Sequence, residues 1–276
     1  MRYAQLVVGP AGSGKSTYCS TMVQQGEIEN KTIHVVNLDP AAEYFEYNPL
    51  IDIRELIHVD DAMEDDEMQF GPNGGLIFCM EYLTENLEWL KKELGDDDDD
   101  FILFDCPGQI ELYTHMDVIK KIAEFLKKEN FMLCSVFLID SQFIIDGAKF
   151  LSGVMAALSV MINLELPHVN ILSKIDLVSK STRKQLESFL EPDPHILLSS
   201  VNTGSRWSKK YTKLSKALGN IIENFSLVKF YPLDIKDEES VADIFLTINN
   251  IIQYGEDADT KAKDVDLFEN REDSFG

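Results

Sequence analysis

The residues with the clearest chemistry lie near the start of the chain, where positions 9–16 read G-P-A-G-S-G-K-S. Glycines at this spacing let successive backbone N–H groups turn inward around phosphate oxygens, and a following helix adds the positive end of its dipole. Lys15 is expected to reach the β- and γ-phosphates of a nucleotide, and the Ser16 hydroxyl to bind Mg²⁺. The predicted phosphate-binding residues are Gly12, Ser13, Gly14, Lys15, Ser16 and Thr17.

A second motif, D-C-P-G-Q, follows the apolar run 101–104. Asp105, at the end of such a strand, is placed to hold Mg²⁺ through water. Gly108 leaves a backbone N–H free to meet a γ-phosphate, and Gln109 stands where a GTPase orients the attacking water. The two motifs together indicate hydrolysis of a nucleoside triphosphate.

A third motif, S-K-I-D at 173–176, follows another apolar run. It matches a guanine-binding pattern in which Ser173 stands where Asn or Thr is usual. The Asp176 carboxylate can accept the two N–H donors that guanine presents at one edge and adenine lacks, while the stem of Lys174 can lie along the base. Ser200 follows the next expected strand, where a second base-contacting loop is expected. These residues predict that the nucleotide is GTP or GDP.

These motifs need a sheet whose strands end at one edge, and the rest of the sequence predicts one. Short apolar runs alternate with stretches of helical periodicity. This order predicts an α/β P-loop nucleotide-binding fold, with a mostly parallel sheet, helices on both faces and extra helical insertions. The expected strands are 4–8, 32–38, 101–104, 135–139, 169–172, 196–198 and 227–231, and the expected helices are 15–25, 76–94, 146–164, 207–224 and 238–255.

The chain is strongly acidic, with a net charge of −23 at pH 7. The segments 60–67, 96–100 and 254–276 account for 16 of these excess charges. Binding to DNA or RNA needs a basic face, and an anionic membrane surface would repel this chain, so neither is an expected partner. We expect the 96–100 run to be a surface loop, and we divide the chain into one domain at 1–255 and a disordered acidic tail at 256–276.

The four cysteines, at positions 19, 79, 106 and 134, have no spacing typical of a zinc site, so free thiols are expected. The first residues lack the profile of a signal peptide. The longest uncharged stretch, 150–164, is too short to span a bilayer. We therefore expect an intracellular, cytoplasmic protein.

Two further segments lie between the first two motifs, namely N-L-D-P-A-A-E at 37–43 and Gly71-Pro72-Asn73. By its chemistry alone, Gly-Pro-Asn is a turn before a helix. The order of all these segments, however, resembles that of the GPN-loop GTPases over residues 3–255. The segments that carry the resemblance are 9–17, 37–43, 71–73, 105–111 and 173–176.

The resemblance implies roles that the spacing does not show. It implies a GTPase core that works as a dimer, in which Asn73 contacts the γ-phosphate or the released phosphate of the facing subunit. Asp39 would help to position Mg²⁺ and the attacking water, with Gln109 beside it. The implied catalytic residues are Lys15, Asp39, Asn73 and Gln109, and the implied metal ligands are Ser16, Asp39 and Asp105.

Within that family, the stretches 70–75 and 253–257 are most similar to the third eukaryotic paralogue. This implies a heterodimer with the first paralogue, a homodimer being the alternative, and a role in the assembly of RNA polymerase II subunits before nuclear import. It also implies a cytoplasmic location with shuttling to the nucleus. The apolar stretch 153–162 belongs either to the core or to a face that meets a partner.

Two other functions fit parts of the sequence. An assembly scaffold that retains its nucleotide with little turnover would keep the same motifs. A kinase would need an arginine-rich lid over an acceptor pocket, and the arginines here are not clustered. Hydrolysis of GTP by in-line attack of water accounts for the whole set of motifs.

Overall fold

The structure, a computed structural model, describes residues 2–64, 70–95, 101–144, 147–179, 183 and 228–253. Its strands are β1 (Arg2–Val8), β2 (Ile33–Asn37), β3 (Ile51–Asp52), β4 (Phe101–Asp105), β5 (Phe131–Asp140), β6 (His168–Ser173) and β7 (Phe230–Pro232). Its α-helices are α1 (Lys15–Ile28), α2 (Val59–Glu64), α3 (Pro72–Glu85), α4 (Leu87–Leu94), α5 (Glu111–Thr114), α6 (Val118–Lys128), α7 (Gly147–Leu164) and α11 (Glu238–Ile251). Short 3₁₀ turns are η1 (Ile53–Glu55), η2 (Ser141–Ile144) and η3 (Ile175–Leu177).

The strands form one seven-stranded sheet in the order β3-β2-β4-β1-β5-β6-β7, and every neighbouring pair is parallel. β1 lies between β4 and β5, and all of its residues are buried. A parallel strand covered on both faces reads as a near-continuous apolar run, which is what the sequence of β1 supplies. The carboxyl ends of the strands meet at one edge of the sheet, and the motifs follow β1, β2, β4 and β6 there.

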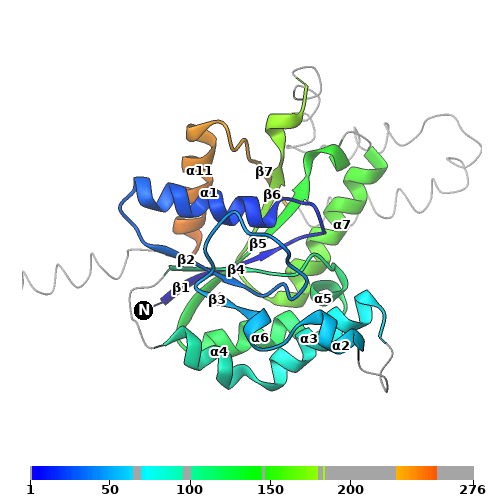
Figure 1. Cartoon of the computed structure of the whole chain (residues 1–276). Coiled ribbons are helices and arrows are strands. Elements are labelled where there is room, and N and C mark those ends of the chain that lie inside the picture. Colours follow the sequence, from blue (N-terminus) through cyan, green and yellow to red (C-terminus); the bar gives the residue numbers. More distant parts are fainter. Residues whose placement is uncertain are drawn as a thin grey trace, which may run out of the picture.

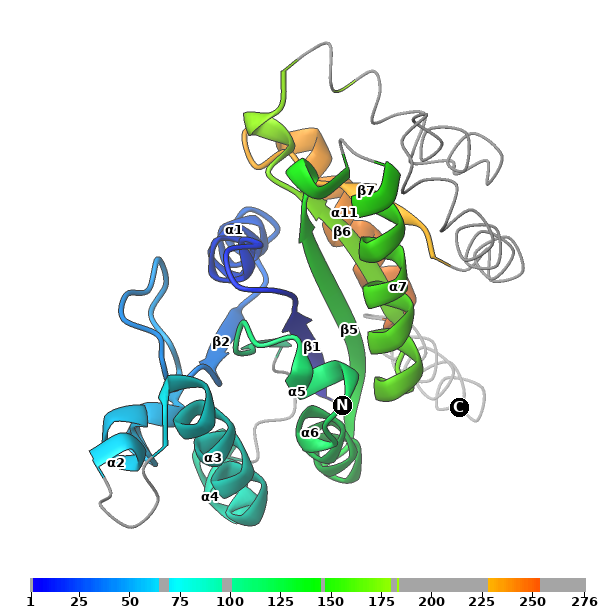
Figure 2. The ribbon, with the colours of Figure 1, turned by 90° about the vertical axis from the view of Figure 1, so that its right-hand side faces the viewer.

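Helices cover both faces of the sheet, as predicted. α1 and α11 pack on one face around Tyr18, Met22 and Phe245. The residues of α3 to α7 belong to the core on the other face. Figure 1 shows α1 and α11 above the sheet, with α3, α4 and α6 below it. In Figure 2, α7 lies along β5 and β6.

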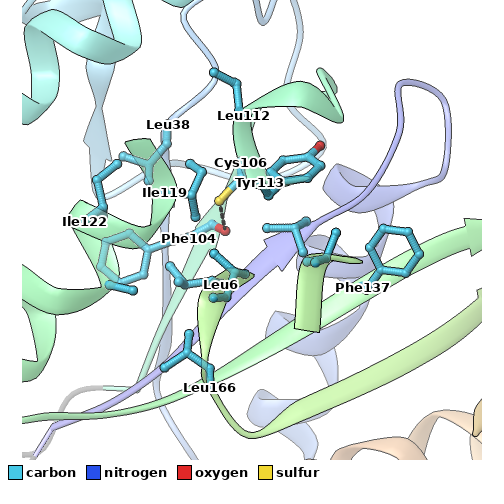
Figure 3. Close-up of a cluster of buried hydrophobic side chains, with 14 of the residues drawn as sticks. Leu6, Leu38, Phe104, Cys106, Leu112, Tyr113, Ile119, Ile122, Phe137 and Leu166 are labelled. Carbon is cyan, nitrogen blue, oxygen red and sulfur yellow. Dashed lines mark hydrogen bonds between the residues drawn. The ribbon is translucent and has the colours of Figure 1, made fainter. Parts of the chain in front are cut away.

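The larger core brings the strands against the helices that follow the second motif. Figure 3 shows Leu6, Phe104 and Phe137 of the sheet together with Leu112 and Ile119 of α5 and α6. Cys106 lies among them, and its thiol is 3.6 Å from the Phe104 carbonyl oxygen. All four cysteines are buried and free, which confirms the expectation of free thiols.

The expected helix 76–94 is wrong in its bounds, because the structure has two helices there. Gly71 precedes α3 in an extended conformation, and Pro72 occupies the first turn, where its missing N–H costs nothing. Asn86 then leaves the helical conformation, and its side-chain amide donates to the Tyr82 carbonyl oxygen at 2.8 Å. Both helices bury leucines in the same core, so the apolar periodicity continues across the break.

Several other elements differ from the sequence prediction. α6 is absent from the predicted helices, although its apolar residues recur at helical spacing and are buried. β3 and η1 were also not named, because two or three residues carry no periodic signal. The last strand is 230–232 rather than 227–231, and the last helix ends at Ile251. The expected elements 196–198 and 207–224, the 96–100 loop and the 256–276 tail lie outside the described residues.

The apolar stretch 153–162 lies in α7 and serves mainly the core. Val154, Ala157, Leu158 and Val160 are buried there. Ile162, by contrast, is 59% exposed. The stretch therefore has one covered face and a narrow exposed edge.

Candidate active site

The loop after β1 has the shape that the glycine motif predicts. Gly9 has a φ of 150°, and a Cβ there would lie 2.4 Å from the Leu138 carbonyl oxygen, so only glycine fits between β1 and β5. Within the loop, the Ser13 N–H donates to the Pro10 carbonyl oxygen at 3.1 Å. α1 begins directly afterwards at Lys15, so its N-terminus faces the space that the loop encloses.

A cavity of about 570 Å³ opens beside this loop, at the carboxyl edge of the sheet. That is where open parallel sheets bind their ligands. It is lined by eleven of the residues predicted from the sequence, namely Gly12, Gly14, Lys15, Ser16, Thr17, Asp39, Asn73, Asp105, Gly108, Gln109 and Lys174. Gly71, Pro72, Ser13, Ser173 and Asp176 do not line it, and Ser200 lies outside the described residues.

Two carboxylates and two lysines line the cavity, and Asp39, Asp105 and Lys15 lie beside the phosphate loop. Burial raises the pKa of Asp39, while the Ala41 N–H, which donates to its Oδ1 at 3.0 Å, and the charge of Lys15 act in the opposite direction. Burial also raises the pKa of Asp105, and hydrogen bonds from Ser16 and Tyr47 oppose that rise. Two carboxylates and a hydroxyl facing one cavity are hard oxygen donors of the kind that Mg²⁺ prefers, so these residues fit the ion.

The second motif lies directly against the phosphate loop. A Cβ at Gly108 would lie 2.8 Å from Ala11 Cα, so the absent side chain allows the two loops to touch. Gln109 Oε1 is buried and has no hydrogen-bond partner in the part of the chain that the structure describes. A buried acceptor without a partner is costly unless a ligand or water supplies one. Gln109 thus lines the cavity and has an acceptor that the described residues leave unused.

Tyr113 is a site residue that the sequence analysis missed. Its hydroxyl lies 2.6 Å from the Gly9 carbonyl oxygen and 2.7 Å from the Pro107 carbonyl oxygen, so it can donate to either. It also accepts from the Gly9 N–H at 3.3 Å. The Tyr113 hydroxyl thus connects the two loops, while its ring lies in the hydrophobic core that Figure 3 shows. Its place in α5 carries no motif, so only the folded structure reveals it.

The segment carrying Asp39 is held by a buried amide. The Asn37 side chain donates to Asp52 Oδ1 at 2.9 Å and to the Asp39 carbonyl oxygen at 3.0 Å, and its Oδ1 accepts from the Asp39 N–H at 3.0 Å. Arg54 Nε lies 2.9 Å and 3.0 Å from the two Asp52 oxygens. The hydrogen bonds from Arg54, together with that from Asn37, lower the pKa of Asp52 despite its burial.

The third motif lies at the end of β6, and its residues have ion-pair partners. Lys174 has a φ of 60°, and its Nζ lies 3.0 Å from Asp140 Oδ2. Asp176 Oδ2 lies 3.1 Å from Lys236 Nζ. Ser173 Oγ is 2.6 Å from the Ser13 carbonyl oxygen, which fixes this strand end to the phosphate loop.

The loop after β7 meets the third motif. The Ile175 N–H donates to the Leu233 carbonyl oxygen at 3.3 Å, and Lys236 pairs with Asp176. β7 pairs with β6, so this loop follows the strand next to the motif in the sheet. The second base-contacting loop predicted around Ser200 lies outside the described residues. Residues 233–236 reach the third motif because β7 pairs with β6.

Asn73 stands in the first turn of α3, with its side chain exposed at the rim of the chain's own cavity. Gly71 and Pro72 set the start of that helix and stay outside the lining. The G-P-N motif is thus the entrance to a helix rather than a free turn.

Comparisons with known proteins agree with this geometry. Residues 7–254 match a family described as "Conserved hypothetical ATP binding protein". A protein named GPN-loop GTPase 3 from Danio rerio is 55% identical over 96% of this chain and 93% of its own length. A protein of the same name from Xenopus tropicalis is 54% identical over 99% of this chain and 97% of its own. The chain belongs to the GPN-loop GTPase family.

This membership confirms the resemblance of the sequence to the third eukaryotic paralogue. As a GPN-loop GTPase, the enzyme binds guanine nucleotides and hydrolyses GTP. The family description names ATP, whereas the relatives are named as GTPases and the chain carries the guanine-type motif ending in Asp176. The two latter observations decide for guanine.

A solved structure with a similar fold supports the architecture. A GTPase from Pyrococcus abyssi in its apo form superposes with a TM-score of 0.70, covering 88% of this chain and 94% of that one, at 24% identity. At that identity the likeness shows the fold, and it confirms the α/β P-loop prediction.

Among the described residues, no helix is long and apolar enough to cross a bilayer.

Proposed function

We propose that this GPN-loop GTPase hydrolyses GTP as a dimer, with Mg²⁺ held at Ser16, Asp39 and Asp105. One observation carries the proposal. Lys15, the two carboxylates and Gln109 line the same cavity, and the oxygen of Gln109 has no partner among the described residues.

Each residue has a part that follows from its position. Lys15 and the backbone N–H groups of the 9–14 loop stabilise the negative charge on the phosphates. Gln109 Oε1 accepts a hydrogen bond from the attacking water and so orients it in line. Bound Mg²⁺ neutralises charge on the β- and γ-phosphate oxygens. Asp176 and Lys174 hold the base, with Ser173 fixing their strand end to the phosphate loop.

We further propose that Asn73 acts on the nucleotide of the facing subunit. Its exposed place at the cavity rim supports this, because a residue on the rim of one site is available to a second copy docked over it. The facing subunit is proposed to be the first paralogue of the family, or a second copy of this chain.

The experiment is a mixing test with two variants that fail for different reasons. Lys15→Ala removes the phosphate lysine but keeps Asn73, and Asn73→Ala keeps the phosphate site. If Asn73 acts across the interface, the two inactive proteins regain GTP hydrolysis when mixed, because one subunit supplies each missing part. If the two variants form a mixed dimer and that dimer stays inactive, Asn73 acts within its own chain. Asn86→Ala, at the far end of α3, is the matched control and leaves hydrolysis unchanged.

Three further measurements test the rest of the proposal. A hydrolysis rate per chain that does not change with protein concentration, alone or with the first paralogue, overturns the dimer. Absence of phosphate release in a single turnover by the dimer supports the nucleotide-retaining scaffold instead. Displacement of fluorescent GDP by ATP as readily as by GTP contradicts the role of Asp176.

For the cellular role we propose assembly of RNA polymerase II subunits, in a cytoplasmic protein that shuttles to the nucleus. The strong negative charge supports partners with basic segments rather than nucleic acid or membranes. Copurification of polymerase subunits that depends on the bound nucleotide is the test. Equal recovery with GDP, GTP and no nucleotide contradicts a nucleotide-controlled role.

A further inference from the structure

The segment between β2 and β3 carries a second residue, besides Asp39, that reaches the proposed Mg²⁺ site. Tyr47 is 9% exposed, although its neighbour Tyr44 is 80% exposed. The Tyr47 hydroxyl donates to Asp105 Oδ2 at 2.8 Å.

Packing holds the Tyr47 ring in this place. The ring of Phe45 lies against it, with centroids 5.3 Å apart. The guanidinium of Arg54 lies 4.6 Å from the Phe45 centroid, at a distance typical of a cation–π contact. Arg54 also donates to the Ala42 carbonyl oxygen at 2.8 Å. Arg54 of the short η1 turn therefore contacts the segment at two residues, Ala42 and Phe45, that precede Tyr47.

The same anchor reaches the other carboxylate. Arg54 binds Asp52, which accepts from Asn37, and Asn37 holds the backbone of Asp39 through two hydrogen bonds. Arg54 thus reaches Asp39 through hydrogen bonds, and it reaches Asp105 through its contact with the Phe45 ring, which packs against Tyr47. Tyr47 donates to Asp105 itself.

We propose that Tyr47 is a positioning residue for the magnesium site, whose hydroxyl holds the Asp105 carboxylate in one orientation beside Ser16. The inference rests on the proposed function, because it needs Mg²⁺ at Ser16, Asp39 and Asp105. A carboxylate that accepts a buried hydrogen bond cannot rotate freely, so its remaining lone pairs would stay available to the hydrated ion. A protein oxygen set in advance binds Mg²⁺ with less ordering cost.

Because Tyr47 and Asp39 lie on the same segment between β2 and β3, binding of the ion is coupled to packing of that segment. Mg²⁺ binding therefore stabilises the packed segment. By linkage, the packed segment favours the ion to the same degree. Loss of the Tyr47 hydroxyl weakens this coupling without removing any residue that contacts the nucleotide in the cavity lining.

The test is Tyr47→Phe, which keeps the ring and its packing and removes only the donor. The measurement is the release rate of fluorescent GDP over a series of Mg²⁺ concentrations. We expect the Mg²⁺ concentration for half-maximal slowing to rise by about fivefold to tenfold, the effect of losing one typical intramolecular hydrogen bond. The release rate in excess chelator should stay unchanged, which a general loss of structure would not allow.

Tyr44→Phe is the matched control, since it makes the same change on the same segment at an exposed position. It should behave as the unchanged protein does. A second variant, Phe45→Leu, removes the ring that supports Tyr47 and should shift the Mg²⁺ dependence in the same direction. Hydrogen exchange of 39–50 should be faster in both Tyr47→Phe and Phe45→Leu in the presence of GDP and Mg²⁺.

The outcomes separate the inference from the proposed function. Equal Mg²⁺ dependence in Tyr47→Phe and the unchanged protein overturns the positioning role. No Mg²⁺ dependence in the unchanged protein or in Tyr44→Phe overturns the magnesium site itself. A Tyr47→Phe protein that releases GDP faster in chelator as well shows a structural role and contradicts the inference.

Discussion

The phosphate end of the cavity is built differently from the predicted base end, the region of Asp176 and Lys236 outside the cavity lining. At the phosphate end, Asp105 is 2% exposed and its partners are the hydroxyls of Ser16 and Tyr47. At the base end, the side chain of Asp176 is 8% exposed, but its partner Lys236 is 70% exposed. Neutral hydroxyl donors hold the Asp105 carboxylate, whereas an exposed lysine side chain holds that of Asp176.

This difference has a physical consequence. Salt screens an exposed ion pair, and such pairs contribute only about 0–1 kcal/mol. Buried hydrogen bonds are not screened, and breaking one leaves an unsatisfied polar group. We therefore expect the phosphate end to be set before the nucleotide arrives and the base end to adjust as it binds.

The largest expected effect comes from the phosphate end. Lys15→Ala should weaken GDP and GTP binding by about 100-fold or more, because it removes the lysine that directly follows the phosphate loop and lines the cavity. Isothermal titration measures the loss. Lys92→Ala, exposed on α4, is the control. GDP affinity within a factor of three of the unchanged protein would contradict the phosphate-loop assignment.

At the base end, Asp176→Asn should reduce the preference for guanine over xanthine nucleotides by about tenfold or more. The amide offers a donor where guanine also has donors, while xanthine presents an acceptor there. Competition against fluorescent GDP with GDP and XDP gives the ratio. Asp243→Asn, exposed on α11, serves as the control. An unchanged ratio in Asp176→Asn would place the base elsewhere.

A smaller effect is expected below the phosphate loop. Tyr113→Phe should lower the free energy of unfolding by about 1–2 kcal/mol, because the Gly9 and Pro107 carbonyl oxygens lose a buried donor. Denaturant unfolding measures it, and hydrogen exchange should rise in both loops. Tyr82→Phe, on the more exposed face of α3, should change neither. Equal stability of Tyr113→Phe would show that the two loops are held by packing alone.

The smallest effect is expected at Lys236. Lys236→Gln should strengthen GDP binding by less than about threefold at low salt, because the ion pair with Asp176 no longer has to open. The difference should vanish at about 0.5 M salt, where exposed charges are screened. Lys236→Arg keeps the charge and should match the unchanged protein. A large effect that survives high salt would make the base end as rigid as the phosphate end.

Sequence reasoning located most of the cavity because its motifs follow strand ends, and parallel strands end at one edge. Lys15, Asp39, Asp105 and Gln109 come together for that reason. It missed Tyr47 and Tyr113, which act through single hydroxyl groups and belong to no motif. It also missed the 233–236 loop, because β7 lies far along the chain from β6.

The helices show the same limit at the level of the fold. Apolar periodicity indicated helix at 76–94 but could not show the break at Asn86, since the same core covers both halves. α6 went unnamed although its apolar face is continuous. Short elements such as β3 depend on pairing with β2, and two residues carry no pattern of their own.

The sequence by itself determined the nucleotide chemistry, because a phosphate loop, a strand-end aspartate and a guanine motif are local patterns that each need few neighbours. The tertiary structure decided how those groups are held. Whether a carboxylate meets a buried hydroxyl, as Asp105 meets Tyr47, or an exposed lysine, as Asp176 meets Lys236, depends on which distant segments pack together. Packing is a property of the whole chain, and no local pattern records it.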